Sequence, residues 1–226
     1  MATATDLQTG LAYDIEGTGT PVVFLHGLTF DRRTWRPVID QLDGSVTSIA
    51  IDLPAHGDSG GEPAPPVNVT EQIHRLLETL GVERPVVAGH SMGAAVAGLY
   101  MSAHPARGIV MVDQATEVLP FAQMLHQIAP LLRGPAFDQV WANIENSLGL
   151  DRIPEPARTL VLDTHKVKQD DVRIDSAVAT VLRTALRRDL VRNSGRGGGA
   201  YREPPCASLP IGSRTCLIPA DRSSTV

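Results

Sequence analysis

The sequence of 226 residues lacks long apolar runs and has few cysteines. No stretch reaches about 18 consecutive apolar residues, so we predict no membrane-spanning helix. The two cysteines, Cys206 and Cys216, have no paired His or Cys ligands nearby, which argues against a disulfide framework and a zinc site. Residues 1–8 contain no basic segment followed by an apolar one. We therefore expect no secretory signal and a cytoplasmic location.

A strong charge of either sign is also lacking. The net charge is −5, and the 42% hydrophobic and 20% charged fractions are ordinary for a globular protein. No basic excess attracts nucleic acid. The run Gly197–Gly199 has no following Lys-Ser/Thr, and the pair Asp170-Asp171 lacks partners at EF-hand spacing. We expect no cofactor, no metal, no nucleic-acid partner and no membrane partner, and the sequence indicates no oligomeric state.

Strand-like and helical patterns alternate over residues 11–150. Short apolar runs predict strands over residues 12–16, 21–25, 46–53, 85–88 and 108–112. Apolar residues at helical spacing predict helices over residues 31–42, 70–80 and 92–104, the first with Asp31 as N-cap. This alternation predicts an α/β fold, a doubly wound and mainly parallel sheet with helices on both faces.

The character of the chain changes twice after this block. Residues 119–132, 137–148, 156–163 and 175–187 have helical periodicity without intervening strands, which suggests a helical cap over one edge of the sheet. Residues 191–226 are rich in Arg, Gly, Ser and Pro, and their only strand-like fragment is 215–218. We divide the chain into a core (1–115), a cap (116–190) and an atypical tail (191–226) expected to be poorly ordered.

The most informative segment runs from Val86 to Ala95. It reads as an apolar strand, then Gly89-His90-Ser91-Met92-Gly93 (G-x-S-x-G), then a helix. This layout exposes Ser91 on a sharp turn between strand and helix, and glycines at both flanking positions avoid clashes with its strained backbone. The helix that follows points backbone N–H groups at the place where an oxyanion would form.

Two further segments agree with this interpretation. The run Val22 to Thr29 ends a buried strand with His26-Gly27, and 52–59 (DLPAHGDS) follows the next strand. Together with the G-x-S-x-G segment, these pieces resemble the α/β-hydrolase family in order and spacing. The resemblance covers residues 11–112 well and the helical block more loosely. Ala55 stands where the family often has Gly.

The resemblance implies roles for individual residues. Ser91 would be the nucleophile, and the backbone N–H groups of Leu28 and Met92 would form the oxyanion hole, with Gly89 and Gly93 shaping the elbow. The family implies a serine hydrolase that cleaves a small ester-like bond through an acyl-enzyme, with a small-molecule substrate selected by the cap. Dehalogenase and epoxide hydrolase chemistry would need aspartate at the elbow, where this chain has Ser91.

The other two members of the expected triad are harder to assign. Asp113 ends the strand 108–112 and is the candidate acid, although it could equally close the strand or cap a helix. Glu203 and Asp221 lack strand context. The family's base follows the last strand, and this chain has no histidine after His165.

The catalytic histidine therefore stays unidentified. His26 and His56 belong to motifs in which the family's histidines are mostly structural. His74 is expected on the polar side of its helix. His126 and His165 in the cap are the remaining candidates for the base.

We interpret the missing histidine and the tail composition as the loss of the family's last strands, through truncation or a frameshift near residues 190–200. An intact reading frame in every isolate would contradict this hypothesis. The alternative function is a non-catalytic or truncated family member that keeps the elbow and a pocket. An incomplete sheet would also leave an exposed edge.

Overall fold

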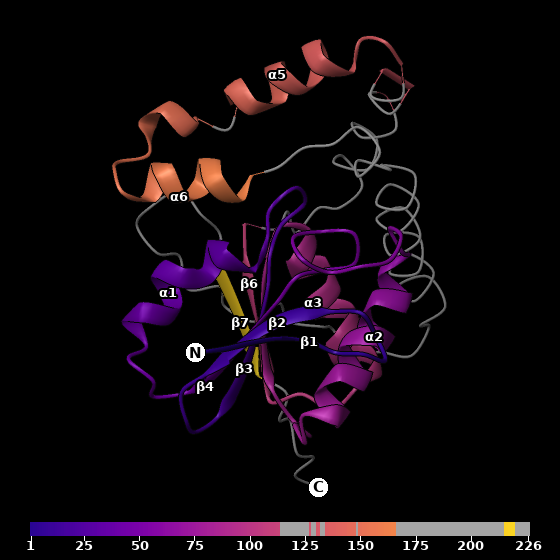
Figure 1. The fold of residues 1–226 in the computed structure, drawn as a ribbon, viewed down its shortest axis with the longest axis vertical. Coiled ribbons are helices and arrows are strands. Elements are labelled where there is room, and N and C mark those ends of the chain that lie inside the picture. Colours follow the sequence, from indigo (N-terminus) through magenta and orange to yellow (C-terminus); the bar gives the residue numbers. More distant parts are fainter. Residues whose placement is uncertain (114–126, 128–129, 132–133, 148, 166–214, 220–226) are drawn as a thin grey trace, which may run out of the picture.

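The computed structural model describes residues 1–113, 127, 130–131, 134–147, 149–165 and 215–219. Within these ranges, one seven-stranded sheet has the strand order β1-β2-β4-β3-β5-β6-β7 and carries helices on both faces (Figure 1). The predicted helices over 119–132 and 175–187, and the tail outside 215–219, fall almost entirely outside the described residues. The division into core, cap and tail therefore stays a prediction.

The centre of the sheet is parallel and its edges are antiparallel. The strands are β1 (Ala2–Thr5), β2 (Ala12–Glu16), β3 (Pro21–Leu25), β4 (Thr47–Ile51), β5 (Val86–His90), β6 (Gly108–Val112) and β7 (Thr215–Pro219). Strands β4, β3, β5 and β6 pair in parallel, whereas β1, β2 and β7 join antiparallel. The mainly parallel interpretation therefore holds for the four central strands that position the candidate site.

The helices follow the predicted pattern with shifted ends. They are η1 (Arg32–Trp35), α1 (Arg36–Gln41), α2 (Pro66–Thr79), α3 (Met92–Ala103), α5 (Phe137–Ser147), η2 (Leu150–Arg152) and α6 (Ala157–Thr164). Asp31 caps η1 by accepting a hydrogen bond from the Arg33 N–H at 2.9 Å. The single helix expected over 31–42 is split into η1 and α1. Pro37 is the second residue of α1, and proline favours the start of a helix at such a position. Likewise, α2 begins at Pro66, before the expected start at residue 70.

Two hydrophobic cores lie on the two faces of the sheet. Alternate residues of each strand point to opposite faces, so Val23 and Leu25 join one core while Phe24 joins the other. The larger core includes the buried faces of α2 and α3, and the smaller one packs Trp35 and Ile39 against the sheet. Both cores hold the carboxyl ends of β3 and β5 in place, where the candidate site lies.

No helix of the described residues is long and apolar enough to cross a membrane.

Candidate active site

Ser91 lies on the sharp turn between β5 and α3, as its motif predicts. Its backbone has φ 50° and ψ −113°, a region that residues with a side chain rarely occupy. The Ser91 N–H donates to the Val112 carbonyl oxygen at 2.9 Å, which ties the turn to the end of β6. The Ser91 carbonyl accepts the N–H groups of Ala94 and Ala95 in the first turn of α3. The surrounding sheet and helix therefore maintain a strained serine.

The two glycines of the motif are required by close packing. A Cβ atom at Gly89 would lie 2.2 Å from the Gly93 carbonyl oxygen. A Cβ atom at Gly93 would lie 2.3 Å from the Leu25 carbonyl oxygen and 2.6 Å from that of His26. All of these neighbours are backbone atoms, which cannot rotate away. The glycines thus let α3 approach both its own strand and β3.

The loop after β3 reaches the same place. The Phe30 N–H donates to the Gly27 carbonyl oxygen at 3.3 Å, and Thr29 has φ 70°, so residues 27–30 form a tight turn. A Cβ atom at Gly27 would lie 3.5 Å from the Ser91 Cβ. Leu28 follows Gly27 in this turn, so the loop brings its backbone to the neighbourhood of Ser91.

Met92 is the first residue of α3. Its N–H has no acceptor within the helix, because the first N–H groups of any helix lack one. The two backbone groups expected to form the oxyanion hole, those of Leu28 and Met92, therefore belong to segments that meet beside Ser91. Their part in catalysis remains a prediction.

Asp113 directly follows β6 and is exposed. Its φ is 50°, so the chain turns sharply there, next to the residue that binds the Ser91 N–H. Burial lowers the pKa of His90, and the negative charge of Asp113 opposes that effect. The structure thus brings Asp113 near the nucleophile's neighbour, although no described histidine binds it.

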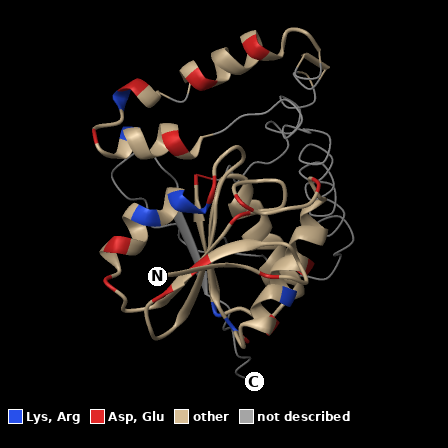
Figure 2. Cartoon of the chain, in the orientation of Figure 1, with Lys and Arg blue, Asp and Glu red and all other residues tan. Residues whose placement is uncertain are grey.

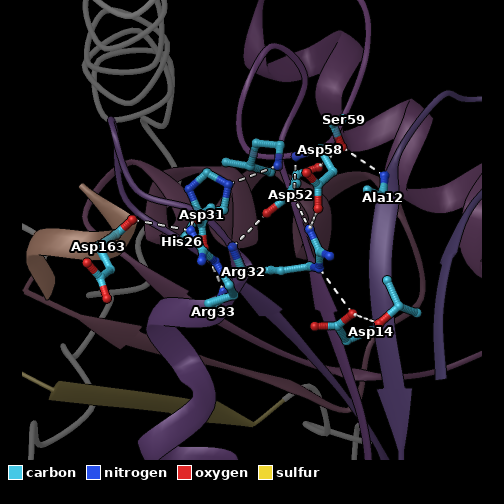
Figure 3. A network of polar contacts seen from close by, with 12 residues as sticks. Ala12, Asp14, His26, Asp31, Arg32, Arg33, Asp52, Asp58, Ser59 and Asp163 are labelled. Atoms are coloured by element: carbon cyan, nitrogen blue, oxygen red, sulfur yellow. Dashed lines mark hydrogen bonds and ion pairs between the residues drawn. The ribbon is translucent and has the colours of Figure 1, made fainter. Parts of the chain in front are cut away.

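A buried ionic network supports the loops around the site (Figure 3). The Arg32 guanidinium pairs with Asp52, with Asp58 at 2.9 Å and with Asp14 at 3.1 Å. Asp52 also accepts the backbone N–H groups of Arg32 at 2.6 Å and Asp58 at 2.8 Å. The Asp52 and Asp58 carboxylates therefore have a structural role, which is to hold these loops together. Ala55, in the same loop, has φ 63°.

His26 is structural. It is fully buried, its Nδ1–H donates to the Gly27 carbonyl oxygen at 2.8 Å, and its Nε2 accepts the Leu53 N–H at 3.0 Å. Burial lowers its pKa to about 3, so the ring is neutral and both nitrogens are used. The Nδ1 of His56 lies 2.9 Å from the Pro54 carbonyl oxygen, and its ring lies 5.1 Å from that of His26. His26 is therefore not available as a base, whereas the Nε2 of His56 is buried without a hydrogen-bond partner.

His74 is partly exposed, and its Nε2 lies 3.8 Å from the exposed Glu78 carboxylate on the same helix. Its ring also stacks on His104 with centroids 4.0 Å apart, and its Nδ1 lies 3.2 Å from the Tyr100 hydroxyl. The cluster joins α2 to the carboxyl end of α3. Ser91 lies at the opposite end of that helix, so neither histidine reaches it.

His165 contacts the loop beside the elbow. Its ring lies 4.8 Å from that of Phe30, which in turn lies 6.1 Å from the ring of His90. Its Nδ1 faces the Glu145 carboxylate at 3.4 Å, and its side chain is 5% exposed. Burial lowers the pKa of His165 while Glu145 opposes the change. His126, the other cap candidate, lies outside the described residues.

Sequence reasoning missed Phe30, Trp141 and Glu145. Glu145 accepts a hydrogen bond from Trp141 Nε1 at 2.9 Å, and these residues stand four apart on the predicted helix. The spacing of four residues could have predicted the contact between Trp141 and Glu145, but nothing in the local sequence indicated that these two residues face His165. The position of Phe30, just after the His26-Gly27 motif, was the available signal for its place near the elbow.

Comparisons with known proteins agree with this architecture. The alpha/beta hydrolase family model matches residues 22–225. The serine hydrolase-like protein of Danio rerio is 33% identical over 102 residues, 42% of this chain and 31% of that protein. A Yersinia pseudotuberculosis enzyme, 2-succinyl-6-hydroxy-2,4-cyclohexadiene-1-carboxylate synthase, is 38% identical over 80 residues, 35% and 29% of the two chains. The chain thus spans about a third of the length of these curated relatives.

Among solved structures, an esterase from Thermogutta terrifontis has a similar fold. The TM-score is 0.60 at 22% identity, covering 78% of this chain and 67% of the esterase.

Proposed function

Because the chain belongs to the alpha/beta hydrolase family, we propose that it cleaves a small ester-like bond through an acyl-enzyme at Ser91. The observation that carries the proposal is the backbone of Ser91, with φ 50° and ψ −113° between β5 and α3. A strained serine at this turn is costly and is found where its hydroxyl is needed for chemistry. The family acts on small molecules, which supports a small-molecule substrate for this chain.

In the proposed reaction, Ser91 Oγ attacks the carbonyl carbon of the ester while a base accepts the hydroxyl proton. The carbonyl oxygen becomes an oxyanion that accepts the N–H groups of Leu28 and Met92. The carbon–oxygen bond to the alcohol then breaks, and the alcohol leaves with the proton. Water attacks the acyl-enzyme in the same way, releasing the carboxylic acid and free Ser91.

The base is proposed to come from the cap. Among the described histidines, His165 contacts Phe30 of the 27–30 loop and has the Glu145 carboxylate 3.4 Å from its Nδ1. Its lowered pKa keeps it neutral, the form that accepts a proton, at pH values below the usual histidine range. Glu145, which faces Nδ1 at 3.4 Å, could orient it, and Asp113, which follows β6 beside the elbow, stays the second candidate acid. His126 remains the second candidate for the base.

One observation favours a second candidate function. Among the described residues, Ser91 Oγ makes no hydrogen bond to an imidazole, whereas a serine needs a base within hydrogen-bond reach in the reacting complex. A non-catalytic family member, which binds a small molecule without turning it over, would have this arrangement. Closure of α5 and α6 toward the elbow when substrate binds would distinguish an enzyme from such a protein.

Fluorophosphonate labelling tests the proposal. The folded protein is treated with the probe and its intact mass is measured, with Ser91→Ala as control and a thermal transition as the check on folding. We expect one adduct on the wild type and none on Ser91→Ala. His165→Gln and Asp113→Asn should each slow labelling at least about tenfold if these side chains activate Ser91. A folded wild type without an adduct would establish the non-catalytic alternative.

A further inference from the structure

A small pocket lies beside the cap helix α5, separate from the elbow. Its volume is about 330 Å³, within the lower range of small-molecule sites. One face of α5 and the residue after α6 line it: Phe137, Asp138, Trp141, Ala142, Glu145 and His165. The site described above does not use Phe137, Trp141 or Asp138, so their arrangement needs its own explanation.

Aromatic rings connect this pocket to the elbow. Trp141 stacks on Phe137 with centroids 6.1 Å apart and 16° between the planes. Trp141 also stacks on His165 at 6.1 Å and 24°, and His165 contacts Phe30 at 4.8 Å. Phe30 meets His90, the residue before Ser91, at 6.1 Å. We call Phe137, Trp141, His165, Phe30 and His90 the aromatic row.

The aromatic row is anchored to the core rather than only to the cap. Arg33 Nη2 donates to the Asp163 carbonyl oxygen at 3.3 Å, and the hydroxyls of Thr34 and Thr164 lie 3.3 Å apart. These contacts hold the end of α6 on η1, which directly follows the 27–30 loop. His165 is thereby kept against Phe30, so the pocket has a defined position relative to the elbow.

The charge at the pocket is negative. Asp138 and Glu145 lie on α5, and this helix carries no Lys or Arg (Figure 2). Burial lowers the pKa of His165, so its ring supplies little positive charge near neutral pH. A carboxylate ligand would meet repulsion there, whereas a neutral ring would stack on Trp141 without that cost.

We propose that the aromatic row binds an uncharged aryl group, which makes esters that carry a neutral aryl group on a linking chain the substrate class of this protein. The inference rests on the proposed function for the position of the bond that is cleaved. Binding to the pocket does not depend on Ser91. The aryl group would stack on Trp141, and the chain that links it to the ester would run along His165 and Phe30 toward the elbow.

The chain has two tryptophans, which gives a direct binding assay. The indole N–H signals of Trp35 and Trp141 are recorded by NMR and assigned with Trp141→Phe. Trp35 is buried in the smaller core and serves as the internal control. The probes are naphthalene-2-carboxamide, its anionic relative 2-naphthoate, and the non-aromatic cyclohexanecarboxamide.

We expect naphthalene-2-carboxamide to shift the Trp141 signal saturably and leave Trp35 unchanged. The affinity for 2-naphthoate should be about tenfold weaker because of the two carboxylates, and that for cyclohexanecarboxamide about fivefold weaker. By calorimetry, Trp141→Leu should bind the aryl amide about fivefold more weakly. The matched control is Gln139→Ala, an exposed change on the same helix, which should bind normally. The Trp35 signal reports folding of each variant.

Equal affinity for the aromatic and non-aromatic amides, or an unshifted Trp141 signal, would overturn the inference. Those results would leave the proposed function standing if fluorophosphonate still labels Ser91. If the folded protein binds the aryl amide but is not labelled by fluorophosphonate, binding at the aromatic row is supported and the proposed catalysis is contradicted.

Discussion

Replacing glycine by alanine should have opposite effects on stability at two positions of α3. Gly93 faces β3, and an added Cβ would lie 2.3 Å and 2.6 Å from two backbone carbonyl oxygens. Gly98, five residues later on the same helix, has nothing within 4 Å of an added Cβ. Ordinary contacts between carbon and oxygen are about 3.3 Å or longer, so Gly93→Ala creates an overlap of about 1 Å. Leu25 is the last residue of β3, a central strand that is paired on both sides, and His26 follows it directly.

The magnitudes follow from these distances. Gly→Ala inside a helix stabilises by about 1 kcal/mol when space is free, so Gly98→Ala should raise the free energy of unfolding by about that amount. At Gly93 the same gain is offset by overpacking, which costs about 1–3 kcal/mol or more where backbone must move. Because the propensity gain is common to both variants, we expect Gly93→Ala to be less stable than Gly98→Ala by roughly 1–3 kcal/mol, the cost of overpacking.

Equilibrium unfolding in urea, followed by circular dichroism, measures both variants against the wild type. The two share one helix and one chemical change, so propensity effects cancel in their difference. If Gly93→Ala raised the unfolding midpoint as much as Gly98→Ala does, the packing of α3 on β3 described above would be wrong, and the role of Gly93 at the elbow would be wrong with it.

Four further changes have expected outcomes. Ala55→Gly should increase the free energy of unfolding by about 1 kcal/mol and so raise the melting temperature, because Ala55 has φ 63°, a conformation that is costly for residues with a Cβ atom. Ser91→Gly should stabilise the fold by about 1–2 kcal/mol and abolish labelling, whereas Ser91→Ala should abolish labelling without that gain. Asp52→Asn should lower the free energy of unfolding in urea by about 3–5 kcal/mol, since the Asp52 carboxylate is buried against the Arg32 guanidinium. Asp58→Asn should lower it by less than about 1 kcal/mol, because Asp58 is largely exposed. The pKa of His26 is lowered from 6.5 to about 3 in the folded protein, so the unfolded chain binds an extra proton between these pH values and stability falls as the pH drops through that window. The unfolding midpoint of His26→Gln should lack this part of the pH dependence. Parallel pH dependences of the wild type and the variant would contradict the assignment.

The central strands and the elbow could be predicted because their signals are local. A strand buried on both faces must be apolar at every position, and Pro21–Leu25 and Gly108–Val112 were predicted with their observed bounds. Ser91 lies where its own flanking glycines and strand require it. In contrast, β1 consists of Ala and Thr with all four residues exposed, so no apolar pattern marks it.

The rest of the candidate site depends on contacts between distant segments. His165 and Phe30 touch only because the end of α6 binds η1, and neither the helical period nor any motif indicates that pairing. The same holds for His74, whose partial burial comes from stacking on His104 of another helix. Ala55 lies between these cases: its departure from the family's glycine was readable, but its positive φ came only from the structure.

The direction of β7 matters for anyone who wants to attach this protein to a surface or a reporter. Thr215 pairs with Val112, next to the elbow, and Pro219 pairs with Gly108 at the far edge of the sheet. Within β7, Thr215 therefore lies at the end of the sheet that carries Ser91, and Pro219 lies at the opposite end. A tether attached at Pro219 would start from the end of the sheet opposite Ser91, so an immobilised protein would present its site to the solution.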